Sequence, residues 1–325
     1  MFIWRAICAA LAAAAILIAA FPTVGSAQDW PSRPVRFIVP FPAGGSTDIV
    51  ARTIAAFVSR DLGQQIYVEN RSGANGNIGM EAAAASAADG YTFLVCGESI
   101  ASNPYVYKMN VDLIKGLIPV VQMSTQPIVL AAHPSLGVKS IAELVALAKQ
   151  KPGLSYATGS GAGSQQHMVV QWFAQIAGID LVQVPYRGGG AAITDLLGGQ
   201  VQLGSLGSAP LIPYYKAGTL LMLAQSTGTR SPSLPDVPTF EQAGIKGLVL
   251  DQWVGVFAPA RTPPAITARL AAEISKGLAD PAIRDSFQKA GLDPATRTPE
   301  QFSAYVGEEG QKFERLVREL HIKAN

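Results

Sequence analysis

Five loops rich in glycine, serine and threonine carry the residue types best suited to hold an anion. They span residues 43–47, 99–102, 158–164, 187–190 and 205–208, and each follows a predicted strand. Free N–H groups at a helix start attract carboxylate or phosphate, and glycine lets the backbone approach such a group closely. A single loop of this kind is more often an ordinary turn with a helix cap. Five of them in one chain predict that at least some form an anion site.

The charged and aromatic residues near these loops have two interpretations each. Arg187 either clamps a carboxylate through two parallel hydrogen bonds or is an ordinary surface arginine. Asp48 is expected in the first turn of a helix, where an acid complements the helix dipole; the alternative is that it contacts a ligand amine. Phe41 and Trp253 are expected in the hydrophobic core, and the alternative is that their rings stack on a ligand. The predicted site therefore consists mainly of hydrogen-bond donors.

Two motifs resemble those of enzymes but are incomplete. Residues 97–101 follow a strand as a nucleophile elbow does, yet Ala101 stands where the last glycine belongs, and the three histidines have no obvious acidic partner. Ser99 keeps an exported serine hydrolase open as the alternative function. Residues 159–163 resemble a dinucleotide fingerprint, but Ser164 replaces its final glycine. Because both motifs are incomplete, we expect no catalytic residue and no cofactor. We expect no metal, because the histidines and cysteines are not spaced as metal ligands are.

The first 27 residues predict a signal peptide. Arg5 is their only charge, residues 6–21 are uninterruptedly apolar, and small residues surround the expected cleavage near Ala27. The apolar run is too short and alanine-rich to favour a membrane anchor. We expect export to the periplasm. Cys96 is then the one remaining cysteine, so stability must come from a packed core.

The composition of the chain excludes further classes of protein. The chain has 325 residues, of which 49% are hydrophobic and 15% charged, and its net charge is +2. Such a composition excludes a disordered chain, and the small charge gives no basic surface for nucleic acid. The length suggests about two domains.

Predicted strands alternate with predicted helices over most of the chain. Helices are expected over residues 47–62 and 141–150, the second capped by Ser140, and the strands should form parallel-type sheets with helices on both faces. The alternation breaks at residues 124–127 and again at 252–255. This pattern predicts the α/β class with two βα lobes joined by two hinge crossovers. We expect residues 28–124 and 254–325 in a discontinuous lobe one, and residues 125–253 in lobe two.

Several motifs resemble one family. The segment WPSRPVRFIVPFPAGGSTD at residues 30–48 looks like the opening of the Bug family, also called TctC, the extracytoplasmic solute-binding proteins of tripartite tricarboxylate transporters. The similarity continues over essentially all of residues 29–325. Further segments similar to family motifs are residues 68–79, 89–92, 103–104, 184–188, 194–201, 216–218 and 230–239.

The resemblance implies a type II-like periplasmic binding protein fold with a ligand cleft between the lobes. It implies a monomer that closes on a small organic carboxylate, held by backbone N–H and hydroxyl groups, and that has inner-membrane transporter subunits as partners and no nucleic acid. Carried over to this chain, the expected ligand-binding residues are Phe41, Ala43, Gly44, Ser46, Thr47, Asp48, Ser99, Ala101, Thr158, Ser160, Gly161, Gly163, Ser164, Tyr186, Arg187, Gly188, Ser205 and Leu206.

One departure from the family bears on the ligand class. After residues 199–201 many relatives carry Asp-Leu-Met-Phe-Asp, and this chain has Gln-Leu-Gly-Ser-Leu at residues 202–206. The second acid can meet a ligand's amino group in such relatives, and Leu206 cannot. We therefore expect a ligand without an amine, such as a di- or tricarboxylate or an aromatic acid. A sensor that presents its ligand to a signalling partner is a further alternative.

Overall fold

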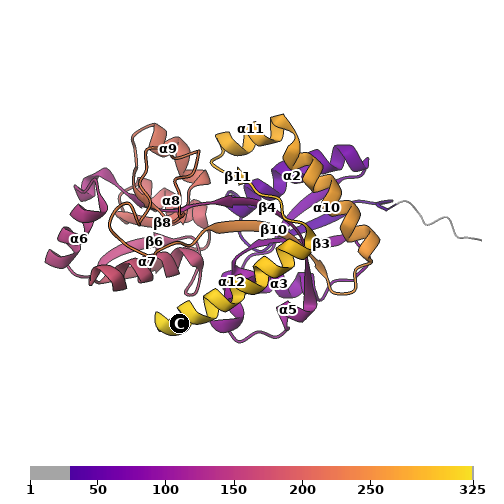
Figure 1. Cartoon of the computed structure of the whole chain (residues 1–325), viewed down its shortest axis with the longest axis horizontal. Helices are drawn as coiled ribbons and strands as arrows, with labels where there is room; N and C mark the ends of the chain where they lie inside the picture. Colours follow the sequence, from indigo (N-terminus) through magenta and orange to yellow (C-terminus); the bar gives the residue numbers. More distant parts are fainter. Residues whose placement is uncertain (1–29, 324–325) are drawn as a thin grey trace, which may run out of the picture. The chain divides into compact units, whose positions relative to one another are not determined.

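The computed structural model describes residues 30–323 (Figure 1). The predicted signal peptide lies outside the described residues. Among the residues described, no helix has both the length and the apolar character needed to cross a membrane. All helices and strands described below belong to one compact unit of the chain, which begins at Arg33.

The first sheet has six strands in the order β11-β4-β10-β3-β1-β2. Strand β1 is parallel to β2 and β3, whereas β10 is antiparallel to β3 and β4. The sheet is therefore mixed, and the parallel-type prediction was wrong for β10, because that strand returns from the second sheet rather than from a helical crossover. The strands are β1 (Val35–Val39), β2 (Ile66–Asn70), β3 (Thr92–Gly97), β4 (Leu117–Gln126), β10 (Gln252–Pro259) and β11 (Asp293–Pro294).

The second sheet has five strands in the order β7-β6-β8-β5-β9. Strand β6 is parallel to β7 and β8, and β5 is antiparallel to β8 and β9. We call each sheet with its helices a lobe. The strands are β5 (Ile128–Ala132), β6 (Leu154–Thr158), β7 (Leu181–Pro185), β8 (Leu203–Gly207) and β9 (Leu221–Gln225).

Helices follow many of these strands, and several of them begin at a capping side chain that the sequence provides. The Ser140 side chain accepts from the Glu143 N–H, as predicted, and Thr298 forms a reciprocal capping box with Gln301. The helices are α2 (Ser46–Leu62), α3 (Asn77–Ala84), α4 (Ser99–Ser102), α5 (Leu113–Gly116), α6 (Ile141–Gln150), α7 (Gln165–Ala177), α8 (Gly189–Leu197), α9 (Ile212–Lys216), α10 (Pro264–Ala279), α11 (Pro281–Lys289) and α12 (Pro299–Glu319).

The chain passes between the sheets along two neighbouring paths. It leaves the first sheet at Gln126 and enters the second at Ile128, so Pro127 alone separates β4 from β5. It returns from β9 to β10 through residues 226–251. The expected linker at residues 124–127 is mostly strand, because β4 and β10 pair as far as Gln126 and Gln252 (Figure 1).

Buried aromatic residues lie where α12 packs against the first sheet. The Trp253 side chain is fully buried, and its ring centroid lies 5.6 Å from that of Phe302, edge to face. The core position predicted for Trp253 is confirmed. Phe41 packs against the core but is only partly buried and also lines the cavity described below, so the same prediction holds for it only in part. Phe41 lies just beyond the carboxyl end of β1, where loops of both lobes meet.

Candidate functional site

A small cavity lies where loops of the two lobes meet. Its volume is about 50 Å³, room for a few water molecules. A larger recess of about 560 Å³ shares Phe41, Pro42, Gly159, Ser160 and Gly188 with it. The cavity is lined by Phe41, Pro42, Gly45, Ser46, Thr47, Asp48, Glu98, Gly159, Ser160, Gln166, Gly188, Gly189, Leu206, Gly207, Pro210 and Gln252.

Contacts between the lobes enclose this cavity. The Tyr107 hydroxyl in the first lobe donates to the carbonyl of Ala162 in the second at 2.5 Å. Gly188, with φ at +114°, faces Pro42 so closely that a Cβ added to the glycine would lie 2.9 Å from the proline Cγ. A side chain at Gly188 would therefore strain the loop and push the two lobes apart.

Two helices point their N-terminal ends at the cavity. Helix α2 starts at Ser46 and α8 at Gly189, and both residues line the cavity. Their N-cap residues, Gly45 and Gly188, form no side-chain hydrogen bond to the helix. The first N–H groups of both helices thus remain available, and the positive ends of two helix dipoles meet at one place. The cavity is suited to hold an anion.

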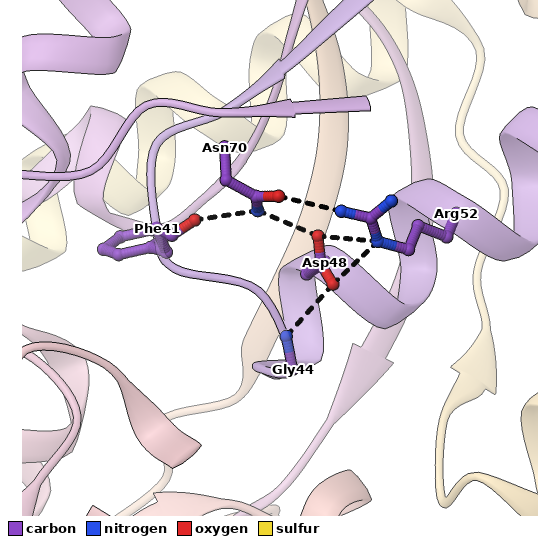
Figure 2. A network of polar contacts seen from close by, with 5 residues as sticks. All are labelled: Phe41, Gly44, Asp48, Arg52 and Asn70. Atoms are coloured by element: carbon purple, nitrogen blue, oxygen red, sulfur yellow. Dashed lines mark hydrogen bonds and ion pairs between the residues drawn. The ribbon is translucent and has the colours of Figure 1, made fainter. Parts of the chain in front are cut away.

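Asp48 fixes the loop between β1 and α2 (Figure 2). Its carboxylate accepts from the Gly44 N–H at 3.0 Å, from Asn70 Nδ2 at 2.8 Å and from Arg52 Nε at 3.0 Å. Asn70 Nδ2 also donates to the Phe41 carbonyl at 3.0 Å. Burial alone would raise the pKa of Asp48, but these hydrogen bonds and the Arg52 charge hold it below its usual value. Asp48 lies in the first turn of α2, as expected, and its charge is matched by Arg52.

Glu98 is the cavity residue that the sequence analysis missed most clearly. It directly follows β3, and only 8% of its surface is exposed. Burial raises its pKa to about 7, and the charge of Glu309 adds to the increase. Hydrogen bonds from its own backbone N–H and from Gln252 Nε2, the latter at 3.3 Å, oppose it. Asp48 is therefore not the only acid in the cavity lining. An acid directly after a strand that leads into a Ser-rich loop is the signal that could have found Glu98.

The structure divides the predicted ligand-binding residues into three sets. Phe41, Ser46, Thr47, Asp48, Ser160, Gly188 and Leu206 line the cavity. Gly161, Tyr186 and Arg187 line the adjoining recess. The residues that line neither space are Ala43, Gly44, Ser99, Ala101, Thr158, Gly163, Ser164 and Ser205.

Three hydroxyl groups of the last set are engaged within the second lobe. Thr158 Oγ1 donates to the Ser160 carbonyl at 2.7 Å, and Ser205 Oγ donates to the Gln166 carbonyl at 2.7 Å. Ser164 caps α7 by accepting from the His167 N–H. These serines and the threonine shape the loops, while Ser160 and Gln166 reach the cavity lining.

The elbow-like motif around Ser99 lies against the core. Ser99 Oγ lies 3.2 Å from Cys96 Sγ, and burial raises the pKa of that thiol to about 12. Ala101 lines a separate, largely apolar pocket that Phe257 and Val306 also line. Within residues 30–323 no group of three or more potential metal ligands comes together.

Comparisons with known proteins agree on one family. The TctC profile, described as "Tripartite tricarboxylate transporter family receptor", matches residues 50–322. Protein BugT of Bordetella pertussis is 36% identical over 307 residues, 92% of either chain. An R. palustris protein solved with adipate has a TM-score of 0.88 and 33% identity, covering 91% of this chain and 99% of its own. MatC from Rhodopseudomonas palustris, solved with malate, has a TM-score of 0.81 and 30% identity, and the match covers 89% of this chain and 100% of MatC.

Proposed function

Because this chain belongs to the TctC family of tripartite tricarboxylate transporter receptors, we propose that it captures a small organic carboxylate and delivers it to a membrane transporter of that type. Its family and its structural neighbours are solute-binding proteins and not enzymes, and the same holds for this chain. The proposal concerns the chemical class of the solute and the partner that receives it.

The convergence of two uncapped helix starts on one cavity carries the proposal. Helix α2 comes from the first lobe and α8 from the second, so an anion between them would join the lobes. The adipate and malate of the two similar structures are both carboxylates. Leu206 gives the cavity an apolar wall where an acid could otherwise hold an amine. These observations support a carboxylate without an amino group.

Capture requires movement of the lobes. A cavity of about 150 Å³ admits benzene, and this one has about 50 Å³, so the lobes must part before a dicarboxylate enters. Because β4 ends at Gln126 and β10 begins at Gln252, we propose residues 28–126 and 252–325 as lobe one and residues 127–251 as lobe two, hinged at Pro127 and before Gln252. The mature protein would act in the periplasm as a monomer after cleavage near Ala27.

A thermal-shift screen tests the proposal. Di- and tricarboxylates, aromatic acids and amino acids are each added to the mature protein, with succinate and aspartate as a matched pair. We expect the unfolding temperature to rise with one or more amine-free carboxylates, because a ligand that binds only the folded state stabilises it. A response to aspartate but not to succinate would contradict the proposed ligand class. Stabilisation by no carboxylate would contradict the proposed function.

Two serines in the cavity lining should each contribute to affinity. Ser46 and Ser160 line the cavity from opposite lobes. Ser46→Ala and Ser160→Ala are each expected to weaken carboxylate binding by about 1–3 kcal/mol, since each removes a donor to a charged group. Ser99→Ala is the matched control, because the Ser99 hydroxyl lies against Cys96 instead. Calorimetry should give wild-type affinity for the control; wild-type affinity in both test variants would mean that the loops are wrongly assigned.

A further inference from the structure

A chain of hydrogen bonds leads from the second lobe to Glu98. The Ala209 N–H donates to Gln126 Oε1 at 3.1 Å, Gln126 Nε2 donates to Gln252 Oε1 at 2.5 Å, and Gln252 Nε2 donates to Glu98 Oε1 at 3.3 Å. We call Gln126 and Gln252 the glutamine relay. Gln126 ends β4 and Gln252 begins β10, so the relay lies at both crossings between the lobes.

The direction of the relay follows from its first member. The Ala209 backbone N–H can only donate, so the atom of Gln126 that faces it must be the amide oxygen. The Gln126 amide nitrogen then faces Gln252, whose oxygen accepts and whose nitrogen is turned toward Glu98. This order fixes both amide orientations, which side-chain shape alone would leave ambiguous. Glu98 Oε1 is therefore an acceptor, and Oε2 lies outside the relay.

No positive charge balances Glu98 among the described residues. None of the ion pairs in this part of the chain includes Glu98, although it lines the cavity. The second-lobe residues of the lining, among them Gln166 and Leu206, are uncharged. Titratable groups that interact with Glu98 or share its cavity are Cys96 on β3, Asp48 on α2, and Tyr305 and Glu309 on α12. Asp251 before β10 and Lys312 on α12 interact with Glu309 in turn.

These neighbours favour a neutral Glu98 when an anion is present. The Asp48 charge is matched by Arg52, and Lys312 pairs with Glu309 rather than with Glu98. An anion that enters the cavity displaces water and adds a second negative charge beside a buried carboxyl. Both effects should raise the pKa of Glu98 above its value of about 7 in the ligand-free protein.

We propose that Glu98 contacts the bound solute and takes up one proton as the anion enters, so that its carboxyl group donates a hydrogen bond to a carboxylate oxygen of the ligand. This inference rests on the proposed function and names the ligand class more closely: a carboxylate end faces Glu98. The proton comes from solvent, adds to the oxygen outside the relay, and returns to solvent on release. An ammonium group at this place would instead keep Glu98 ionised.

The relay explains why this arrangement belongs to the closed protein. Its first donor, Ala209, comes from the second lobe, and its last acceptor, Glu98, from the first. When the lobes part, Gln126 loses the group that fixes its orientation. Glu98 is then held in place for the ligand only when both lobes are together, which links closure, ligand contact and proton uptake.

Calorimetry in two buffers of different ionisation enthalpy tests the inference. The mature protein is titrated with adipate, malate and succinate in PIPES and in imidazole, between pH 6 and pH 8. We expect uptake of about half a proton at pH 7 and about tenfold weaker binding at pH 8 than at pH 6, because Glu98 must be protonated in the complex. Glu98→Gln should still bind at pH 7, since an amide N–H replaces the acid O–H, and should show neither effect.

Glu309→Gln is the matched control. It removes a neighbouring acid that contributes to the raised pKa of Glu98 but does not line the cavity. Proton uptake should persist in this variant, with the pH dependence moved to lower pH. Carboxylate binding to the wild type without proton uptake, or uptake that persists unchanged in Glu98→Gln, would overturn the inference while leaving the proposed function intact. If none of the three acids binds, the carboxylate with the largest thermal shift takes their place. Failure of the wild type to bind any carboxylate of that screen would overturn the proposed function and this inference with it.

Discussion

Gly207→Ala is expected to weaken carboxylate binding by about 1–3 kcal/mol, or roughly 5- to 150-fold, the usual effect of overfilling a packed site. A Cβ at Gly207 would lie 2.4 Å from Gln252 Oε1, 2.7 Å from Ser46 Oγ and 2.8 Å from Gln126 Nε2. All three atoms belong to side-chain ends, so each can move. If they move, the glutamine relay breaks and Ser46 leaves its place in the cavity lining. If they do not move, the added methyl group pushes the lobes apart.

Gly190→Ala provides the control for this variant. The chemical change is the same, Gly190 lies on α8 beside the site, and a Cβ there meets no atom within 4 Å. Calorimetry of both variants should show the loss only for Gly207→Ala. Equal affinities in the two variants would contradict the close approach of the lobes described here.

Glu98→Gln is expected to stabilise the ligand-free protein at pH 8 by about 3 kcal/mol and to leave its stability unchanged at pH 4. The pKa of Glu98 is about 7 in the folded protein, against an ordinary value of 4.5. Below pH 4.5 the carboxyl is protonated in both the folded and unfolded states, so it has no effect on their balance. As the pH rises from 4.5 to 7, the unfolded state gains from ionisation and the folded state does not, so wild-type stability falls.

Urea unfolding of both proteins at several pH values measures this difference. The free energy of unfolding of Glu98→Gln minus that of the wild type should increase from pH 4 to pH 7 and then stay level. A difference that is independent of pH would show that Glu98 titrates near its ordinary value in the folded protein.

Local sequence patterns predicted much of the fold. Helix α6 occupies the predicted residues 141–150 and has the predicted cap at Ser140, because capping and hydrophobic periodicity depend on near neighbours. The antiparallel placement of β10 was not predictable in this way. It depends on pairing with β3 and β4 across more than a hundred residues, which no local pattern encodes.

The same distinction separates the predicted and unpredicted parts of the site. Glycine- and serine-rich loops indicated Ser46, Ser160 and Gly188, since backbone requirements are visible in sequence. Whether a given hydroxyl faces the cavity depends on its local partner, as with Ser205 and the Gln166 carbonyl. Glu98 remained hidden because its significance comes from its burial and from its hydrogen bond with Gln252, which lies 154 residues further along the chain.

Small-angle X-ray scattering of the mature protein with and without a saturating carboxylate tests the central claim most directly. Adipate and malate are the first ligands to use, and calorimetry establishes that the site is filled. If the lobes close on a carboxylate between α2 and α8, the radius of gyration must be smaller with ligand than without it. An unchanged radius with a tightly bound, saturating carboxylate would contradict capture by lobe closure.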